Sequence, residues 1–341
     1  MNLGWAIIST GRHPDTKMAP AINSAAEATL VAVVSRNAGR ARAFADKHGA
    51  AAAYDDLASM LANPAVDIVY VASPNGLHRE HVLMAAAAGK HVLVEKPMAL
   101  AVEDCQAMID ACASARVKLG VGFHLRTHPG HQRVRALVAS GEIGNVSLTT
   151  ANWGRGTRGQ TKPPPRPELQ AWWDNPALVG AGAFMATGVH CVDIMRYLLG
   201  REVTQVTALT DATTEAPLEE LMVMALRFDD GSLGTVMTGR RTPGYEGNDA
   251  IVYGSEGKAG VHGGIGMVLG GTLDVSAGVT IENQSYENDP IALYRWQVDS
   301  FNAAVISGGE PVASGLDGLR AAQITLAMVE SARTGQRVDI Q

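Results

Sequence analysis

The sequence predicts an α/β protein with a doubly wound parallel sheet, followed by an α+β half with a large, open, mostly antiparallel sheet. Through residue 125, short apolar runs alternate with alanine-rich helical segments, as in βαβ units. After Gly144 the segments become longer and alternate between apolar and polar residues, which is typical of antiparallel strands with one covered face. We therefore expect two domains, at residues 1–123 and 124–341.

In the first half, each predicted strand is a short apolar run: Gly4–Ser9, Thr29–Ser35, Val66–Ser73, His91–Glu95 and Lys118–Phe123. The predicted helices are the segments between and after them: Pro14–Ser24, Gly39–Lys47, Leu57–Leu61, His78–Ala88 and Val102–Ala115. Proline suits the first turn of a helix, where its missing N–H would have no partner anyway. Strands that are apolar throughout indicate a sheet covered on both faces.

In the second half, the alternating segments are predicted strands: 146–153, 201–209, 221–228, 232–240, 248–254 and 279–286. A helix over Phe184–Leu199 interrupts them, and helices over Tyr294–Ile306 and Leu316–Thr334 follow. The last of these is a candidate to pack back on the first domain.

Composition limits the classes of function. The chain of 341 residues is 46% hydrophobic and carries a net charge of −6, which argues against a nucleic-acid or membrane-surface partner. No apolar run approaches the roughly 18 residues of a membrane span, and no signal segment precedes the first strand. The three cysteines show no disulfide or metal spacing, so we expect a cytoplasmic protein without a metal site.

The loop after the first strand carries a reduced dinucleotide motif. In the sequence Ser9-Thr10-Gly11-Arg12-His13-Pro14, only the middle glycine of G-x-G-x-x-G is present, so the motif by itself is weak. A doubly wound (Rossmann) sheet binds its ligand beyond the carboxyl ends of its strands. We therefore expect cofactor contacts from Ser9, Thr10, Gly11 and Arg12.

The end of the second strand bears on cofactor choice. Folds that prefer NAD usually place an acidic residue there to bind the ribose 2′-hydroxyl. This chain has Ser35, Arg36 and Arg40, a set that suits a 2′-phosphate, so NADP(H) is favoured and NAD(H) is possible. Alternatively, Arg36 only stacks on the adenine, and either cofactor binds.

Three further stretches carry a family resemblance. The third predicted strand runs into SPNGLH (73–78), AGKHVLVEKPMAL (88–100) follows one helix later, and GLDGLRAAQITLAMVESARTGQRV (315–338) lies near the end. In this order the sequence resembles the Gfo/Idh/MocA family of NAD(P)-dependent oxidoreductases over essentially the whole chain. The stretches VGFHLRTHP (121–129) and LQAWW (169–173) look most like its 1,5-anhydrofructose reductase branch. The resemblance implies cofactor contacts from Ser73, Pro74, Asn75, His78, Glu95, Lys96 and Pro97.

The resemblance also implies a role for Lys96. In the family this lysine lies beside the nicotinamide and hydrogen-bonds the substrate oxygen that gains or loses a proton. A cation fixed there controls charge at that oxygen during hydride transfer. Glu95 is then its electrostatic neighbour, and Pro97 stiffens the turn.

The family's second signature is a helix with an aspartate, a histidine four residues later and another aspartate three residues after that. Residues four apart share one helical face. His190 matches the histidine and is the predicted proton donor or acceptor, whereas Ala186 replaces the first aspartate. Asp193 either orients His190 or caps local backbone.

Other substrate contacts are expected from the resemblance at His124 and Arg126, near the cleft. The pair Trp172-Trp173 stands where close relatives carry Trp-Arg. The two indoles form a flat wall for a sugar ring, or else one of them packs against Pro163–Pro167.

Together these features predict an NADP(H)-dependent oxidoreductase that acts on a sugar, or sugar-derived, carbonyl/hydroxyl pair. The alternatives are a hydride-borrowing enzyme that cleaves or eliminates glycosidic bonds with retained cofactor, and a non-catalytic cofactor-sensing regulator. The apolar strands 221–228 and 233–238 exceed what the helix Phe184–Leu199 can cover. We therefore expect a homodimer or homotetramer formed through the second-domain sheet.

Overall fold

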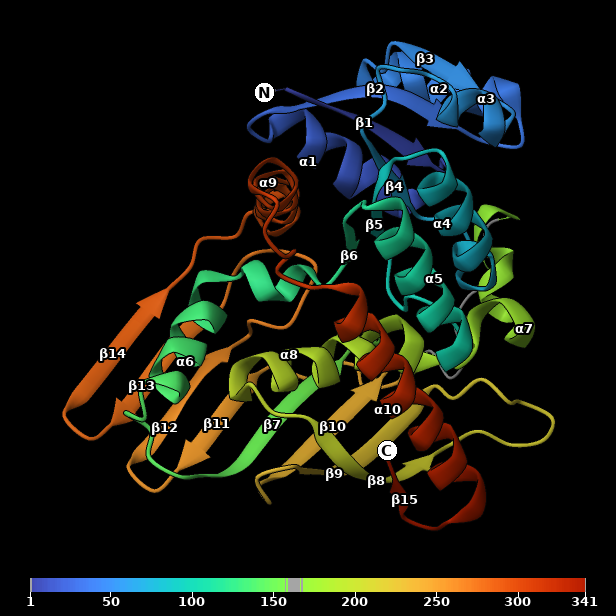
Figure 1. Cartoon of the computed structure of the whole chain (residues 1–341). Coiled ribbons are helices and arrows are strands. Elements are labelled where there is room, and N and C mark those ends of the chain that lie inside the picture. Colours follow the sequence, from blue (N-terminus) through green and yellow to red (C-terminus); the bar gives the residue numbers. More distant parts are fainter. Residues whose placement is uncertain (1, 157, 159–165, 167, 341) are drawn as a thin grey trace. The chain divides into compact units, whose positions relative to one another are not determined.

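A computed structural model describes residues 2–156, 158, 166 and 168–340 of the chain. It divides into two compact units, coloured along the chain in Figure 1. The first unit comprises Met1–His124, Pro167–Val179 and Ile291–Leu319. The second comprises Leu125–Arg166, Gly180–Pro290 and Arg320–Gln341. Two elements, η3 (His124–Thr127) and α10 (Gly315–Thr334), contribute residues to both units.

The first unit contains a six-stranded sheet in the order β3-β2-β1-β4-β5-β6, and all its strands are parallel. The strands are β1 (Leu3–Ile8), β2 (Ala28–Val34), β3 (Ala52–Tyr54), β4 (Ile68–Val71), β5 (His91–Val94) and β6 (Leu119–Val121). This order is the doubly wound Rossmann arrangement, so the predicted fold class is confirmed. The strand β3 was not predicted, because three residues rich in alanine carry no strand pattern.

Strand register brings the loops of the first unit to one edge of the sheet. Ile8 is the partner of Val34 on one side and of Val71 on the other, and Val71 is in turn the partner of Val94. The segments that leave β1, β2, β4 and β5 therefore begin side by side at the carboxyl ends of the strands. In such sheets this edge is where the ligand binds.

The helices and helical turns of the first unit are η1 (Pro14–Met18), α1 (Ala19–Ser24), α2 (Ala38–His48), α3 (Leu57–Leu61), η2 (Asn75–Leu77), α4 (His78–Ala87), α5 (Val102–Ala115), η4 (Glu168–Asp174), α7 (Pro176–Val179) and α9 (Ala292–Ser307). Although α9 comes late in the chain, it belongs to the same hydrophobic core as β1. The Trp5 ring meets Phe301 edge to face at 5.9 Å, and its Nε1 donates to Asn302 Oδ1 at 3.0 Å. A late segment thus completes this core.

The second unit contains a nine-stranded sheet in the order β14-β13-β12-β11-β7-β10-β9-β8-β15. Its strands are β7 (Val146–Gly154), β8 (Val203–Thr210), β9 (Leu221–Phe228), β10 (Leu233–Gly239), β11 (Ala250–Gly254), β12 (Gly257–His262), β13 (Thr272–Ala277), β14 (Thr280–Ser285) and β15 (Val338–Asp339). Only the β7–β10 pair is parallel among these neighbours, so the predicted mostly antiparallel sheet is confirmed. Strands β12, β13 and β15 were not predicted.

One face of this sheet is covered by helices of its own unit. The helices are α6 (Pro129–Ala139), which contacts β12, and the continuous run of η5 (Phe184–Gly188) and α8 (Val189–Leu199), which contacts β7, β10 and β11. The helix α6 was not predicted, and it covers part of this face in addition to the predicted helix. Along β9 the side chains alternate: Met222 is fully buried, whereas Val223 is 51% exposed on the other face.

The run Pro176–Leu199 has the length and apolarity of a membrane-spanning helix, but 83% of its most apolar window is buried inside the protein. Core helices of globular proteins share these properties.

Cys105, Cys112 and Cys191 are buried free thiols.

Candidate functional site

The loop after β1 keeps the shape of a dinucleotide-binding turn with few glycines. Ser9 occupies the place of the first fingerprint glycine, and its φ of 105° is one that side chains rarely adopt. Its hydroxyl accepts a hydrogen bond from Gly11 N at 3.2 Å, which offsets part of this strain. The following helix opens with the π-helical turn η1, whose Asp15 N bonds Gly11 O at 3.1 Å. Such π turns are frequent at functional sites.

The end of β2 presents a hydroxyl and two guanidinium groups. The Ser35 hydroxyl lies 3.5 Å from Thr10 Oγ1, which joins this loop to the one after β1. Asn37 caps α2 by accepting a hydrogen bond from Arg40 N at 2.8 Å. Arg36 is exposed and Arg40 half-buried, and the buried Nε of Arg40 finds no hydrogen-bond partner among the described residues. This chemistry fits an anionic group of a dinucleotide.

The segment after β4 is tied to the segment after β5 by one buried histidine. His78 lies within hydrogen-bond distance of two backbone carbonyls, Pro97 O (3.0 Å) and Ser73 O (2.9 Å). Burial lowers the pKa of His78, although the two carbonyls oppose this, and a neutral ring, which has one N–H, donates to only one of them. The Ser73 hydroxyl meets His81 Nδ1 at 2.8 Å.

Asn75 joins the same segment to a distant part of the chain within the first unit. Its side-chain amide donates to Val179 O in α7 at 3.0 Å. Gly76 lies against the backbone of α7, since a Cβ there would be 3.2 Å from Ala177 O. The segment Glu168–Asp174 next to α7 holds Trp172 and Trp173, whose half-buried rings stack at 4.5 Å. Most of the proline segment that was the alternative partner for these indoles lies outside the described residues.

Glu95 is held as an anion beside Lys96. Tyr70 donates its hydroxyl to Glu95 Oε1 at 2.5 Å, and His13 Nε2 lies 3.3 Å from the same oxygen. The backbone N–H of Lys96 donates to Glu95 Oε2 at 3.3 Å. Burial alone would raise the pKa of Glu95, but His13, the Lys96 charge and the Tyr70 hydrogen bond lower it to about 2. The peptide bond between Lys96 and Pro97 is cis.

Tyr294, from α9, packs its aromatic ring against the residues around Glu95, which was not predicted from the sequence. The predicted substrate residue His124 stacks on its ring at 4.6 Å, and His13 meets it edge to face at 5.3 Å. Tyr294 is 1% exposed, and its hydroxyl has no hydrogen-bond partner among the described residues. Burial and the Glu95 charge raise the pKa of Tyr294 well above its usual value. No local pattern marks a tyrosine so late in the chain as part of this cluster.

His190 lies in the second unit and is the second residue of α8, which directly follows the π-helical turn η5. The N–H of Val189 bonds the carbonyl of Phe184, five residues earlier. The His190 ring is 2% exposed and lies 5.4 Å from the Trp153 ring.

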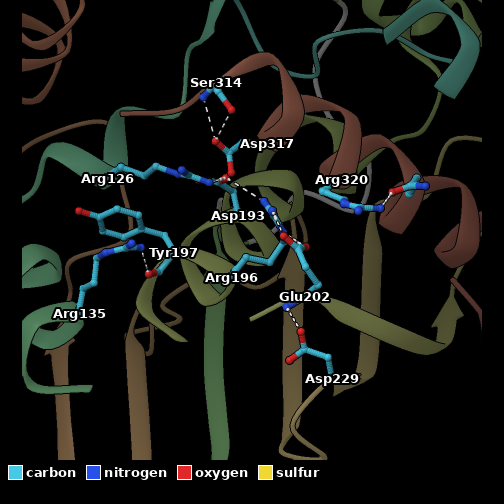
Figure 2. Close-up of polar contacts among 11 residues, drawn as sticks. Arg126, Arg135, Asp193, Arg196, Tyr197, Glu202, Asp229, Ser314, Asp317 and Arg320 are labelled. Atoms are coloured by element: carbon cyan, nitrogen blue, oxygen red, sulfur yellow. Dashed lines mark hydrogen bonds and ion pairs between the residues drawn. The ribbon is translucent and has the colours of Figure 1, made fainter. Parts of the chain in front are cut away.

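Asp193 and Arg126, both predicted substrate contacts, pair with each other (Figure 2). Arg126 donates from Nε to Asp193 Oδ2 at 3.0 Å and from a terminal nitrogen to Oδ1 at 2.6 Å. Arg196 lies 3.9 Å from the same carboxylate and binds Glu202 through two bonds of 2.7 Å. Asp193 thus has a third role, that of anchoring α8 to η3 within the second unit. Within the described parts of the chain, no cluster of three or more His, Cys, Asp or Glu side chains could hold a metal ion.

Comparison with known proteins matches both halves of the chain. Residues 3–123 match the oxidoreductase family with an NAD-binding Rossmann fold, and residues 131–260 match the GFO/IDH/MocA C-terminal domain. A 1,5-anhydro-D-fructose reductase of Ensifer adhaerens is 31% identical over 92% of this chain and 91% of its own length. A D-xylose 1-dehydrogenase (NADP(+)) of Haloferax volcanii is 29% identical over 98% of this chain and 99% of its own.

Among solved structures, an aldose-aldose oxidoreductase from Caulobacter crescentus, complexed with glycerol, superimposes with a TM-score of 0.87. It is 28% identical, and the alignment covers 100% of both chains. Both halves are matched, and one relative is 31% identical over 92% of this chain, so the chain belongs to the Gfo/Idh/MocA family of oxidoreductases, as the sequence resemblance implied.

Proposed function

We propose that the protein is an NADP(H)-dependent oxidoreductase that transfers hydride between the nicotinamide and a sugar, or sugar-derived, carbonyl/hydroxyl pair. The observation that carries this proposal is the Glu95–Lys96 pair at the carboxyl end of β5, where an ionised carboxylate is fixed beside a lysine. The related reductase and dehydrogenase named above favour this reaction over glycoside cleavage or a purely regulatory role.

The bound nicotinamide would supply or accept the hydride, and the chain's own residues would manage charge and protons. Lys96 places a positive charge at the substrate oxygen, where negative charge develops as the carbonyl carbon gains hydride. His190 gives that oxygen a proton during reduction and takes it back during oxidation. Glu95 balances the charge of Lys96.

The residues around β1 and β2 support the choice of NADP(H). Ser35, Arg36 and Arg40 offer a hydroxyl and two cations at the position where NAD-specific folds place a carboxylate. The buried Nε of Arg40, which has no hydrogen-bond partner among the described residues, would bind a phosphate oxygen. NAD(H) would bind without these contacts and therefore more weakly.

On the substrate side, we assign direct contacts to His124, Trp172 and Trp173, whose aromatic faces suit a sugar ring. Arg126 and Asp193 neutralise each other in a buried pair, so we assign them the role of fixing α8. A monosaccharide derivative with a carbonyl adjacent to hydroxyl-bearing carbons fits this set.

We also propose that residues 1–123 form the cofactor domain, that residues 124–341 form the substrate domain, and that the protein is cytoplasmic. A homodimer or homotetramer would form through the outer face of the second-unit sheet, which exposes Leu209, Val223 and Leu233.

The test is consumption of NADPH or NADH at 340 nm by purified protein with 1,5-anhydrofructose, aldoses and ketoses, and the reverse reaction with their alcohols. We expect turnover with at least one sugar and a lower KM for NADPH. Binding of neither cofactor, or no turnover with any compound in either direction, would overturn the proposal.

A further inference from the structure

One buried glutamate fixes the start of the helix that carries His190. Glu219 precedes β9, and its carboxylate accepts hydrogen bonds from the backbone N–H of Gly182 at 2.7 Å and of Phe184 at 2.9 Å. Its own carbonyl accepts a third bond, from Ala183 N at 2.7 Å. The first N–H groups of a helix have no partner within the helix, and here one residue satisfies three in succession.

Gly182 and Glu219 fit only as a pair. A Cβ atom on Gly182 would lie 2.0 Å from the carbonyl oxygen of Glu219 and 2.6 Å from its nitrogen. Position 182 therefore has no room for a side chain while Glu219 keeps this position. Glu219 is 3% exposed, so its two oxygen atoms are committed to the helix rather than to solvent.

The residues that Glu219 holds, 182–184, are connected to His190 through one continuous helical segment. From Phe184 the chain forms the π turn η5 and passes directly into α8. Thr187 strengthens this turn, since its hydroxyl bonds Ala183 O at 2.9 Å. A displacement at residues 182–184 would therefore shift Ala186 and His190 together.

We propose that Glu219 is a positioning residue for His190. By holding the N-terminus of the continuous run of η5 and α8, Glu219 determines the position of the His190 imidazole. The inference rests on the role proposed above for His190, and it extends that role to a residue on a different strand.

A carboxylate suits this position better than an amide. Each of its two oxygens accepts one N–H, and its negative charge complements the helix dipole. A glutamine has the same shape, but its NH₂ group would face one of the two N–H donors. Burial raises the pKa of Glu219 although the N–H groups of Phe184 and Gly182 and the Arg240 charge oppose this, so the anion is held at a cost in stability.

The experiment compares Glu219→Gln with Glu220→Gln. Glu220 is the matched control because it is the next residue and pairs with Arg240 at 3.0 Å instead of capping the helix. The measurements are kcat, KM and the Kd for NADPH, together with the NMR signal of the His190 imidazole in protein labelled with ¹³C-histidine. The His190 signal is assigned from its loss in His190→Gln.

We expect Glu219→Gln to lower kcat by about 10- to 100-fold, as for a misplacement near 1 Å, with the Kd for NADPH unchanged. The His190 signal and its titration midpoint should shift in Glu219→Gln and stay in place in Glu220→Gln. Glu219→Asp, which keeps the charge but shortens the reach, should fall between wild type and Glu219→Gln.

An unchanged His190 signal and a kcat within twofold of wild type in Glu219→Gln would overturn the inference. So would a loss of folding and cofactor binding in both Glu219→Gln and Glu219→Asp, because Glu219 would then serve stability alone. If the wild-type protein turns over no sugar, the proposed function fails, but the His190 signal still decides the positioning role.

Discussion

Arg126 holds Asp193 through two parallel hydrogen bonds, and both side chains are buried, with 6% and 1% of their surface exposed. A buried pair of this kind gains little over an apolar replacement, but a partner left alone is an uncompensated charge. The Tyr197 ring, 5.2 Å from the Arg126 guanidinium carbon, lies on the same helix as Asp193 (Figure 2).

Arg126→Met should therefore lower the free energy of unfolding by about 3–5 kcal/mol at pH 7, because Asp193 loses its bidentate partner and the more distant Arg196, at 3.9 Å, does not replace those hydrogen bonds. Urea unfolding followed by circular dichroism measures the change. The control is Arg42→Met, which removes one side of the exposed pair with Asp46 and should have a much smaller effect. Equal losses in the two variants would show that the Arg126–Asp193 pair contributes no more than a surface contact.

Lys96→Ala should reduce turnover by about 10²-fold or more, because the charge at the substrate oxygen is lost. The fold should persist, as judged by the thermal unfolding midpoint. Lys118→Met is the control: Lys118 precedes the neighbouring strand β6, and its ammonium lies 3.3 Å from Glu310. Near-normal kcat in Lys96→Ala would remove Lys96 from the mechanism.

His190→Ala should lower kcat by about 10²–10⁴-fold if the imidazole transfers the proton. The wild-type kcat should then follow a titration in the neutral pH range, and this dependence should disappear in the variant. Steady-state rates from pH 5 to 9 are the measurement. A flat profile in both proteins would mean that His190 only packs against Trp153.

The double variant Arg36→Ala/Arg40→Ala should weaken NADPH far more than NADH. Each charge-assisted hydrogen bond to the 2′-phosphate contributes about 1.5–3 kcal/mol, and NADH has no such phosphate. Isothermal titration with both cofactors measures the difference. An equal loss for the two cofactors would place these arginines against the adenine or in solvent.

Val223→Asp should split the proposed oligomer without affecting cofactor binding, because Val223 points outward from β9 while Met222 points into the core. Light scattering at micromolar concentration gives the mass. Val279→Asp, at a fully exposed turn beside the edge strand β14, should leave the mass unchanged. A monomeric wild-type protein would refute the predicted self-association.

The strand ends at the carboxyl edge of the first-unit sheet could be predicted because their signals are local. Apolar runs give β1, β4 and β5, and the polar residues that follow each run mark the edge of the sheet. The loop after β1 was harder to predict, because Ser9 adopts a positive φ at a position where the dinucleotide-binding motif normally has glycine.

The features that could not be predicted from the sequence are those that depend on contacts between residues far apart in the chain. Nothing around Arg126 indicates a partner on α8, and Glu219 has no local feature that links it to Gly182. The helix α6 was not predicted, although Pro129 is a residue type that commonly begins a helix. Tertiary pairing of this kind has no signature in the spacing of residues.

The position of α9 in the chain has a consequence for biosynthesis. The helix that packs on Trp5 and its strand, Ala292–Ser307, is translated long after them. Until then the apolar surface around Trp5 stays open to water and to chaperones. The final compaction of the first unit therefore waits until α9 has been synthesised, and a chain truncated before α9 would keep this apolar surface exposed.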